Sequence, residues 1–281
     1  MADIVLGHAT SCIYCDNVED ARTKEHLIAA SLGGRFVVEA ASCSACCRCT
    51  SLLELGVSRR IFHLARAFYK MPTRRPKEYP KTVAVNVLFG KYGPKREVLV
   101  PLSDAPIVIV APIYRTDNKK DAEGRIWSLG QLEVTQIDRE RFHGRVDAIL
   151  RRYKAHSVTM ESLPFKVNGD FERTIWKTAY GFFWLTDRDS LEASAAKAFI
   201  FGTTELYQVR GNEIYYQDMF SRKRQKLLGH RAAAAVYTME EENHSHLYCE
   251  MNFFEKLGLP LYYCRILNAS GQPFERVNFI D

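Results

Sequence analysis

Four cysteines near the amino terminus have the spacing of metal ligands. Cys12 and Cys15 form one C-x2-C pair, Cys43 and Cys46 form a second, and 27 residues separate the two pairs. Two such pairs can place four thiolates around one tetrahedral ion, and zinc is the ion for which this arrangement is typical. Paired disulfides or unrelated thiols are the alternatives. The spacing predicts a structural zinc site formed by these four residues.

The segment between the two pairs contains an acid–histidine dipeptide, Glu25-His26, followed by an apolar pair and then by Gly33-Gly34. A zinc site that only stabilises its own fold does not need such a dipeptide. Histidine can accept a proton from water, and a divalent ion can stabilise the charge that develops on a phosphate during hydrolysis. An ordinary exposed pair of residues is the other interpretation. The combination with the cysteines favours a nuclease site.

Positive charge is concentrated directly after the cysteine pairs. The chain of 281 residues has a net charge of +6, but residues 57–96 contain eleven Lys or Arg residues and one acid, Glu78, and carry +10. This concentration favours binding to a phosphate backbone, although a solvated helix face followed by a basic linker gives the same pattern. The candidate nucleic-acid-binding residues are Arg59, Arg60, Arg66, Lys70, Arg74, Arg75 and Lys77.

The run from Cys12 to Ser51 resembles an HNH endonuclease of the ββα-metal type with a four-cysteine structural zinc. The resemblance rests on the segments CIYC, TKEHLIAASLGG and ASCSACCRCTS. It is looser over residues 52–80 and 166–185 and is absent elsewhere. It implies an amino-terminal ββα zinc finger, followed by a mixed α+β region, and an activity that hydrolyses phosphodiester bonds in DNA.

The resemblance also implies roles for single residues. His26 would be the general base, and Glu25 would bind the catalytic metal ion. Members of the family usually have Asn or His directly after the second cysteine pair as a further ligand, and this chain has Cys47 there. A thiolate prefers softer ions to Mg2+. We expect either Zn2+, Mn2+ or Ni2+ with Cys47 as a ligand, or Mg2+ held weakly by Glu25 and water, or an inactive site.

Hydrophobic periodicity predicts an α+β chain beyond the cysteines. Helices are expected over residues 50–71, 138–154, 171–186 and 191–201, and strands over 82–89, 97–102, 107–114, 126–133, 205–209, 213–217, 232–237, 246–254 and 259–267. Cys49 is expected to be a small buried residue on the first helix. The aromatic side chains over 171–186 are expected to form core or a dimer interface rather than a base-stacking platform.

The expected organisation has four parts. A nuclease domain occupies residues 1–70, a basic proline-rich linker 71–80, a small β-rich domain that ends in a helix 81–165, and an α+β domain 166–281. No secretory signal and no apolar run of about 18 residues is recognisable, so we expect a cytoplasmic protein that does not enter membranes.

These observations predict a metal-dependent HNH endonuclease that acts on DNA, or on RNA, in phage defence or restriction. The alternative is a catalytically inactive zinc module that binds nucleic acid, because Cys47 replaces the usual metal ligand. A third interpretation is an effector whose carboxy-terminal half senses a ligand or partner and controls the nuclease. A homodimer contact or a regulatory protein partner is expected through residues 166–281.

Overall fold

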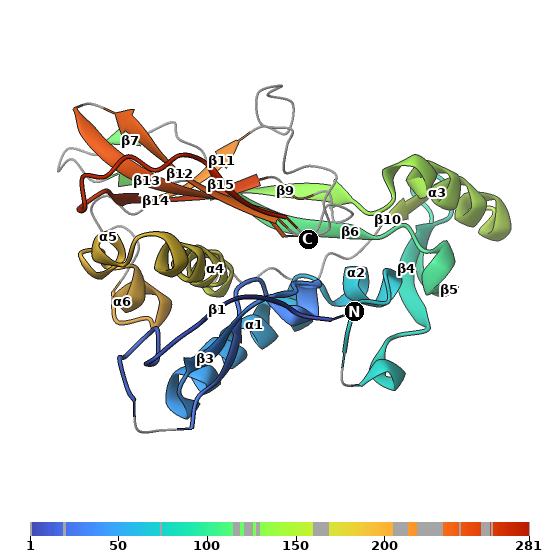
Figure 1. Ribbon diagram of the computed structural model, residues 1–281. Helices are drawn as coiled ribbons and strands as arrows, with labels where there is room; N and C mark the ends of the chain where they lie inside the picture. Colours follow the sequence, from blue (N-terminus) through green and yellow to red (C-terminus); the bar gives the residue numbers. More distant parts are fainter. Residues whose placement is uncertain are drawn as a thin grey trace.

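The computed structural model describes residues 2–18, 21–73, 75–114, 119–120, 126–127, 130–159, 169–204, 213–217, 233–241, 243–253, 259 and 261–280. Its architecture is a mixture of helices and sheets, which confirms the predicted α+β class. Figure 1 shows a large sheet at the top, a layer of helices below it, and the amino-terminal unit below those helices.

The amino-terminal unit contains three strands and a helix. Strand β1 (Ile4–His8) pairs in parallel with β3 (Phe36–Ser42), and β3 pairs antiparallel with β2 (Thr23–His26). Helix α1 (Ser44–Arg60) follows β3 directly, with Cys43 as its N-cap residue. The chain therefore runs strand, strand, helix through β2, β3 and α1, and Glu25-His26 forms the end of β2.

The helix predicted over 50–71 is longer at its start and is interrupted near its end. Helix α1 begins at Ser44 and ends at Arg60, and a separate helix, α2 (His63–Phe68), follows. The residues of α1 that face the core lie three or four positions apart, as on one helix face. Cys49 lies outside that face and is exposed, so its predicted burial is wrong.

The part predicted as a small β-rich domain forms three small sheets within the residues that the structure describes. Strands β4 (Thr82–Leu88), β5 (Lys95–Pro101) and β10 (Ser157–Thr159) form one in the order β10-β4-β5. Helix α3 (Arg139–Tyr153) agrees with the helix predicted over 138–154 and precedes β10, and the short 3-10 helix η2 (Pro76–Glu78) precedes β4. The other two sheets each contain two strands: β6 (Val108–Tyr114) with β9 (Gly130–Gln136), and β7 (Lys119–Lys120) with β8 (Ile126–Trp127). The strand predicted over 126–133 is therefore two strands.

The carboxy-terminal part combines three helices with an antiparallel sheet. Helix α4 (Asp170–Thr186) agrees with its prediction, whereas the helix predicted over 191–201 is two short helices, α5 (Arg188–Glu192) and α6 (Ala196–Ile200). The sheet has the order β11-β14-β13-β12-β15. Its strands are β11 (Glu213–Gln217), β12 (Ala233–Glu241), β13 (His244–Asn252), β14 (Leu261–Leu267) and β15 (Val277–Ile280). The strand predicted over 205–209 lies outside the described residues.

Helix α4 lies at the centre of the hydrophobic core. Its residues are buried almost continuously from Phe171 to Phe183, because the sheet covers one side and the amino-terminal unit the other (Figure 1). The ring of Tyr180 stacks on Tyr14 with centroids 5.2 Å apart, and Phe171 meets Tyr262 of the sheet at 5.3 Å. The aromatic set of α4 is therefore core, as expected. Among the described residues, no helix is both long and apolar enough to cross a membrane.

Candidate metal centre and the acid–histidine pair

The four predicted zinc ligands lie together. The sulfur atoms of Cys12, Cys15, Cys43 and Cys46 are all within 4.8 Å of one another, and none of these cysteines is in a disulfide. Four thiolates at a zinc–sulfur distance of about 2.3 Å in a tetrahedron would have sulfur atoms about 3.8 Å apart. The Cys15 and Cys43 sulfurs, 3.6 Å apart, are close to that spacing. The cluster could hold a metal ion such as zinc.

The local fold explains why the thiols converge. Cys12 and Cys15 lie in the turn after β1, and the backbone N–H of Asp16 donates to the Cys12 carbonyl to close that turn. Cys43 lies at the amino-terminal end of α1, where backbone N–H groups favour negative charge. The N–H of Cys46 lowers the pKa of Cys43 to about 7, so its thiolate is accessible near neutral pH.

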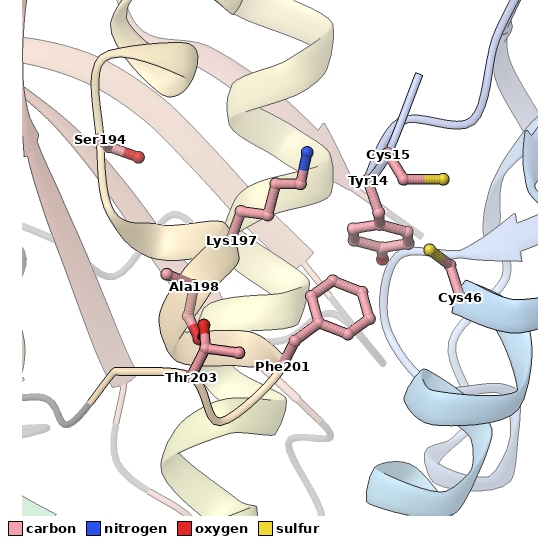
Figure 2. Close-up of a pocket in the computed structure, with 8 residues that line it drawn as sticks. All are labelled: Tyr14, Cys15, Cys46, Ser194, Lys197, Ala198, Phe201 and Thr203. Atoms are coloured by element: carbon pink, nitrogen blue, oxygen red, sulfur yellow. Dashed lines mark hydrogen bonds between the residues drawn. The ribbon is translucent and has the colours of Figure 1, made fainter. Parts of the chain in front are cut away.

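A cavity of about 460 Å3 adjoins this thiol cluster. Cys15 and Cys46 line one side, and Lys197 and Phe201, on α6 and just after it, face them from the other side (Figure 2). Tyr14 forms part of the same wall, with its ring 5.5 Å from that of Phe201. The cavity is therefore lined by two of the four residues of the thiol cluster.

Glu25 is buried in an ion pair with a residue far away in the sequence. The Nζ atom of Lys177, on α4, lies 2.6 Å from Oε1 of Glu25 and 2.6 Å from Oε1 of Glu54 on α1. The same ammonium group donates a hydrogen bond to the carbonyl of His26. The Lys177 side chain is 1% exposed and that of Glu25 is 6% exposed. One ammonium group thus joins β2, α1 and α4.

Burial and neighbouring charges shift the pKa values of Lys177 and Glu54. Burial acts against the charged form of Lys177, but the two carboxylates together raise the pKa of Lys177 above its usual value, so it stays an ammonium. Burial raises the pKa of Glu54, Lys177 opposes that shift, and the charge of Glu25 adds to it. Glu54 keeps 20% of its side chain exposed. Glu54 is thus the more exposed of the two carboxylates that face Lys177.

This arrangement does not fit a catalytic metal ion at Glu25. Within the described part of the chain, the group that could hold a metal is the four-cysteine cluster. The carboxylate oxygen of Glu25 instead faces the ammonium of Lys177, so a divalent ion would have to displace a buried cation. Cys47 lies on α1, half-buried, with its sulfur 3.8 Å from the hydroxyl of Ser51. Cys47 precedes Glu54, the other carboxylate that meets Lys177, by seven residues, which is about 10 Å along the helix.

His26 points to a different neighbour from Glu25, as the alternation of a strand requires. Its Nε2 atom lies 3.4 Å from Oδ1 of Asp3, and its side chain is 23% exposed. Asp3 also pairs with Lys24. Burial lowers the pKa of His26, and the carboxylate of Asp3 opposes this shift in part. His26 is therefore mainly neutral at pH 7, so one of its two ring nitrogens carries no proton.

The predicted nucleic-acid-binding residues have several different surroundings. Arg59, Lys70, Arg75 and Lys77 are exposed, and Arg60 is 63% exposed although it lies 3.7 Å from Asp170. Arg75 also pairs with Glu78 at 3.1 Å. Arg74 lies outside the described residues.

Arg66 has an internal role. It is 7% exposed, and its guanidinium donates to the carbonyls of Ser31 (2.7 Å) and Pro72 (3.2 Å). These bonds hold the loop between β2 and β3 against the end of α2. The Arg66 guanidinium is therefore occupied within the fold.

Three residues that shape this site were missed by the sequence analysis: Asp3, Glu54 and Lys177. Lys177 carried a usable signal, because it is the single charged residue in the segment 174–186. A lone lysine in an apolar helix that is buried on several sides needs a partner of opposite charge. Asp3 and Glu54 carried no comparable signal, since both lie among other polar residues.

Comparisons with protein-family models, with curated proteins and with solved structures find no match for this chain. The likeness to HNH endonucleases therefore rests on the sequence motifs alone, chiefly those of the segment 12–51.

We expect purified protein to contain about one zinc ion per chain, measured by atomic emission. The Cys43→Ser variant should lose the ion and melt at a lower temperature, because it removes one of four thiolates. Cys49→Ser on the same helix is the matched control and should keep the ion. Equal zinc content in both variants would contradict the assignment.

Breaking the buried ion pair between Lys177 and Glu25 should lower the free energy of unfolding. Lys177→Met leaves Glu25 as an unpaired buried carboxylate, and we expect a loss of about 3–5 kcal/mol in the free energy of unfolding. Adding Glu25→Gln to that variant should recover part of the loss, which urea denaturation of the two single and the double variants measures. Strictly additive losses would show that the two groups do not interact. Lys24→Met, which removes an exposed pair, should change little.

The protonation of His26 can be followed by NMR. We expect its titration midpoint below 6.5, and a still lower midpoint in Asp3→Asn, because that variant removes the anion that favours the charged ring. The unfolded chain then takes up this proton at a higher pH than the folded chain. The contribution of His26 to stability is thus complete above about pH 6.5 and is lost as the pH falls through the folded-state pKa. A midpoint above 6.5 would contradict the burial argument.

Proposed function

We propose that this protein binds nucleic acid through an HNH-like amino-terminal unit that a structural zinc ion stabilises, and that the unit lacks a working catalytic metal site. The observation that carries the second part is the ammonium of Lys177, 2.6 Å from the Glu25 carboxylate. In an HNH endonuclease the corresponding acid is expected to bind the metal ion. Here it is buried and already neutralised from within the chain.

Exposed basic residues support the first part of the proposal. Arg59 and Arg60 end helix α1, which begins at the cysteine cluster, and Lys70, Arg75 and Lys77 follow α2. Cations on a helix anchored at its start by a metal site are held in fixed positions, so less conformational entropy is lost when they meet phosphates. The expected mode is contact with the phosphate backbone, which gives affinity with little sequence preference.

A second candidate function is metal-dependent hydrolysis of nucleic acid at the same unit. Two observations favour it: the chain runs strand, strand, helix through β2, β3 and α1, and His26 ends β2 with a lowered pKa. A neutral, partly exposed histidine can accept a proton from water. This function requires Glu25 to exchange Lys177 for a metal ion, so it needs a movement of α4 relative to β2.

One experiment separates the two functions. We expect the full chain to bind duplex DNA in fluorescence anisotropy, with an affinity that falls steeply as salt is raised, and to leave plasmid uncut in Mg2+, Mn2+ or Ni2+. Arg59→Gln and Lys77→Gln should each reduce the salt slope by about 1. Arg188→Gln is the matched control, because Arg188 is exposed on α5 and stacks on Trp184.

Two other results would change this conclusion. Plasmid cleavage that EDTA abolishes and that His26→Ala also abolishes would establish the nuclease. Absence of DNA binding by zinc-loaded protein at low salt would reject both functions and leave a zinc module for another kind of partner.

A further inference from the structure

The β4–β5 hairpin combines an exposed aromatic residue with a concentration of positive charge. Residues 88–97 and 151–156 together contain six Lys or Arg residues and one acid, Glu97. Tyr92, in the turn of the hairpin, is 89% exposed, the highest value among the large hydrophobic side chains that the structure describes as exposed. Neither feature is needed to hold the amino-terminal unit or the core together.

The shape of this turn is fixed by its backbone. Phe89 N–H donates to the carbonyl of Pro94 at 3.2 Å and closes the loop. A side chain at Gly93 would place its Cβ atom 1.4 Å from the Phe89 carbonyl oxygen, and Gly90 has a φ of +74° that favours glycine. The turn therefore has one well-defined conformation that presents Tyr92 to solvent.

The end of helix α3 adds cations next to the base of the hairpin. His156 N–H donates to the carbonyl of Leu88 at 2.7 Å, and β10 pairs with β4 through Ser157 and Leu88. The residues just before His156 include Arg151, Arg152 and Lys154, all exposed. The last turn of α3 thus lies beside the start of the turn that carries Tyr92, and Figure 1 shows α3, β4 and β5 together at the right of the molecule.

Several of these cations lie close to aromatic rings at the surface. Lys91 lies 5.3 Å from the ring of Tyr92, Arg96 lies 5.4 Å from Phe89, and Arg152 lies 5.6 Å from Tyr153. Such contacts order long side chains without neutralising their charge. An edge strand is often rich in Lys and Arg to prevent pairing with other chains, and β5 is such a strand. That purpose explains Arg96, but it does not explain an exposed tyrosine in the turn.

We propose that this surface is a second contact site for duplex DNA, with the cations of the hairpin and of α3 on the phosphates and Tyr92 inserted into a groove. The inference rests on the proposed function and extends it to residues outside the basic segment 59–77. A two-stranded β-ribbon fits a DNA groove, and apolar side chains at such tips wedge between base steps. Arg145 of α3 connects the two sites, since it stacks on Phe68 of α2 at 4.9 Å.

The test uses the full chain and a fluorescein-labelled duplex of about 20 base pairs at several salt concentrations. Lys91→Gln and Arg152→Gln should each lower the slope of log affinity against log salt by about 1. Tyr92→Ala should weaken binding about tenfold and leave that slope unchanged, because the lost contact is apolar. All three positions are exposed, so the melting temperature should not change.

Two matched variants are the controls, and both should bind as the unaltered protein does. Leu99→Ala removes an apolar side chain that is 64% exposed on β5, and Lys81→Gln removes an exposed cation at the opposite end of the sheet. If the hairpin variants bind normally while Arg59→Gln binds weakly, the hairpin site is rejected and the proposed function stands. If the unaltered protein binds no duplex, both are rejected. The same variants are also measured with a labelled single strand. If Tyr92→Ala weakens binding to the single strand more than binding to the duplex, the duplex assignment is rejected.

Discussion

The buried ammonium of Lys177 is the interaction on which the arrangement of this protein depends. It meets the Glu25 carboxylate at the end of β2, Glu54 in the middle of α1 and the main chain at His26. A cation taken out of water needs partners in the right geometry, and each partner left alone would be a buried charge. The amino-terminal unit therefore has one favourable position on α4, and the packing of Tyr14 on Tyr180 adds to the same contact.

The four cysteines constrain the same unit from its other end. They join the turn after β1 to the start of α1, while Glu54 fixes α1 further along. With a metal ion bound to the cysteines, α1 would be held at two points by directional contacts and could not slide or rotate against β2 and β3. The position of that helix also sets the position of its basic end and, through α2, of the segment that leads to β4. Rigidity at a charged surface reduces the conformational entropy lost when such a surface binds a partner.

Local patterns predicted a good part of the fold. The cysteine spacing, helices α3 and α4 and strand β11 follow from residues that are near one another in the sequence. The break between α1 and α2, the exposure of Cys49 and the internal role of Arg66 depend on what packs against that segment, which periodicity does not contain. Lys177 is 151 positions from His26, and no spacing rule connects them. Its isolation in an apolar helix indicated burial, but the choice of partner is a tertiary effect.

A short motif also leaves out the tertiary contacts that decide the chemistry of its residues. In the segment that resembles HNH endonucleases, Glu25 and His26 form the end of β2, and β3 and α1 follow. Chemistry depends, however, on what the carboxylate faces, and that is decided by a helix from the other half of the chain. An ammonium and a divalent ion are both cations, so either satisfies a buried glutamate electrostatically. Only the metal ion could also polarise a phosphate and a water molecule. Lys177 therefore neutralises Glu25 within the fold but does not supply that polarisation.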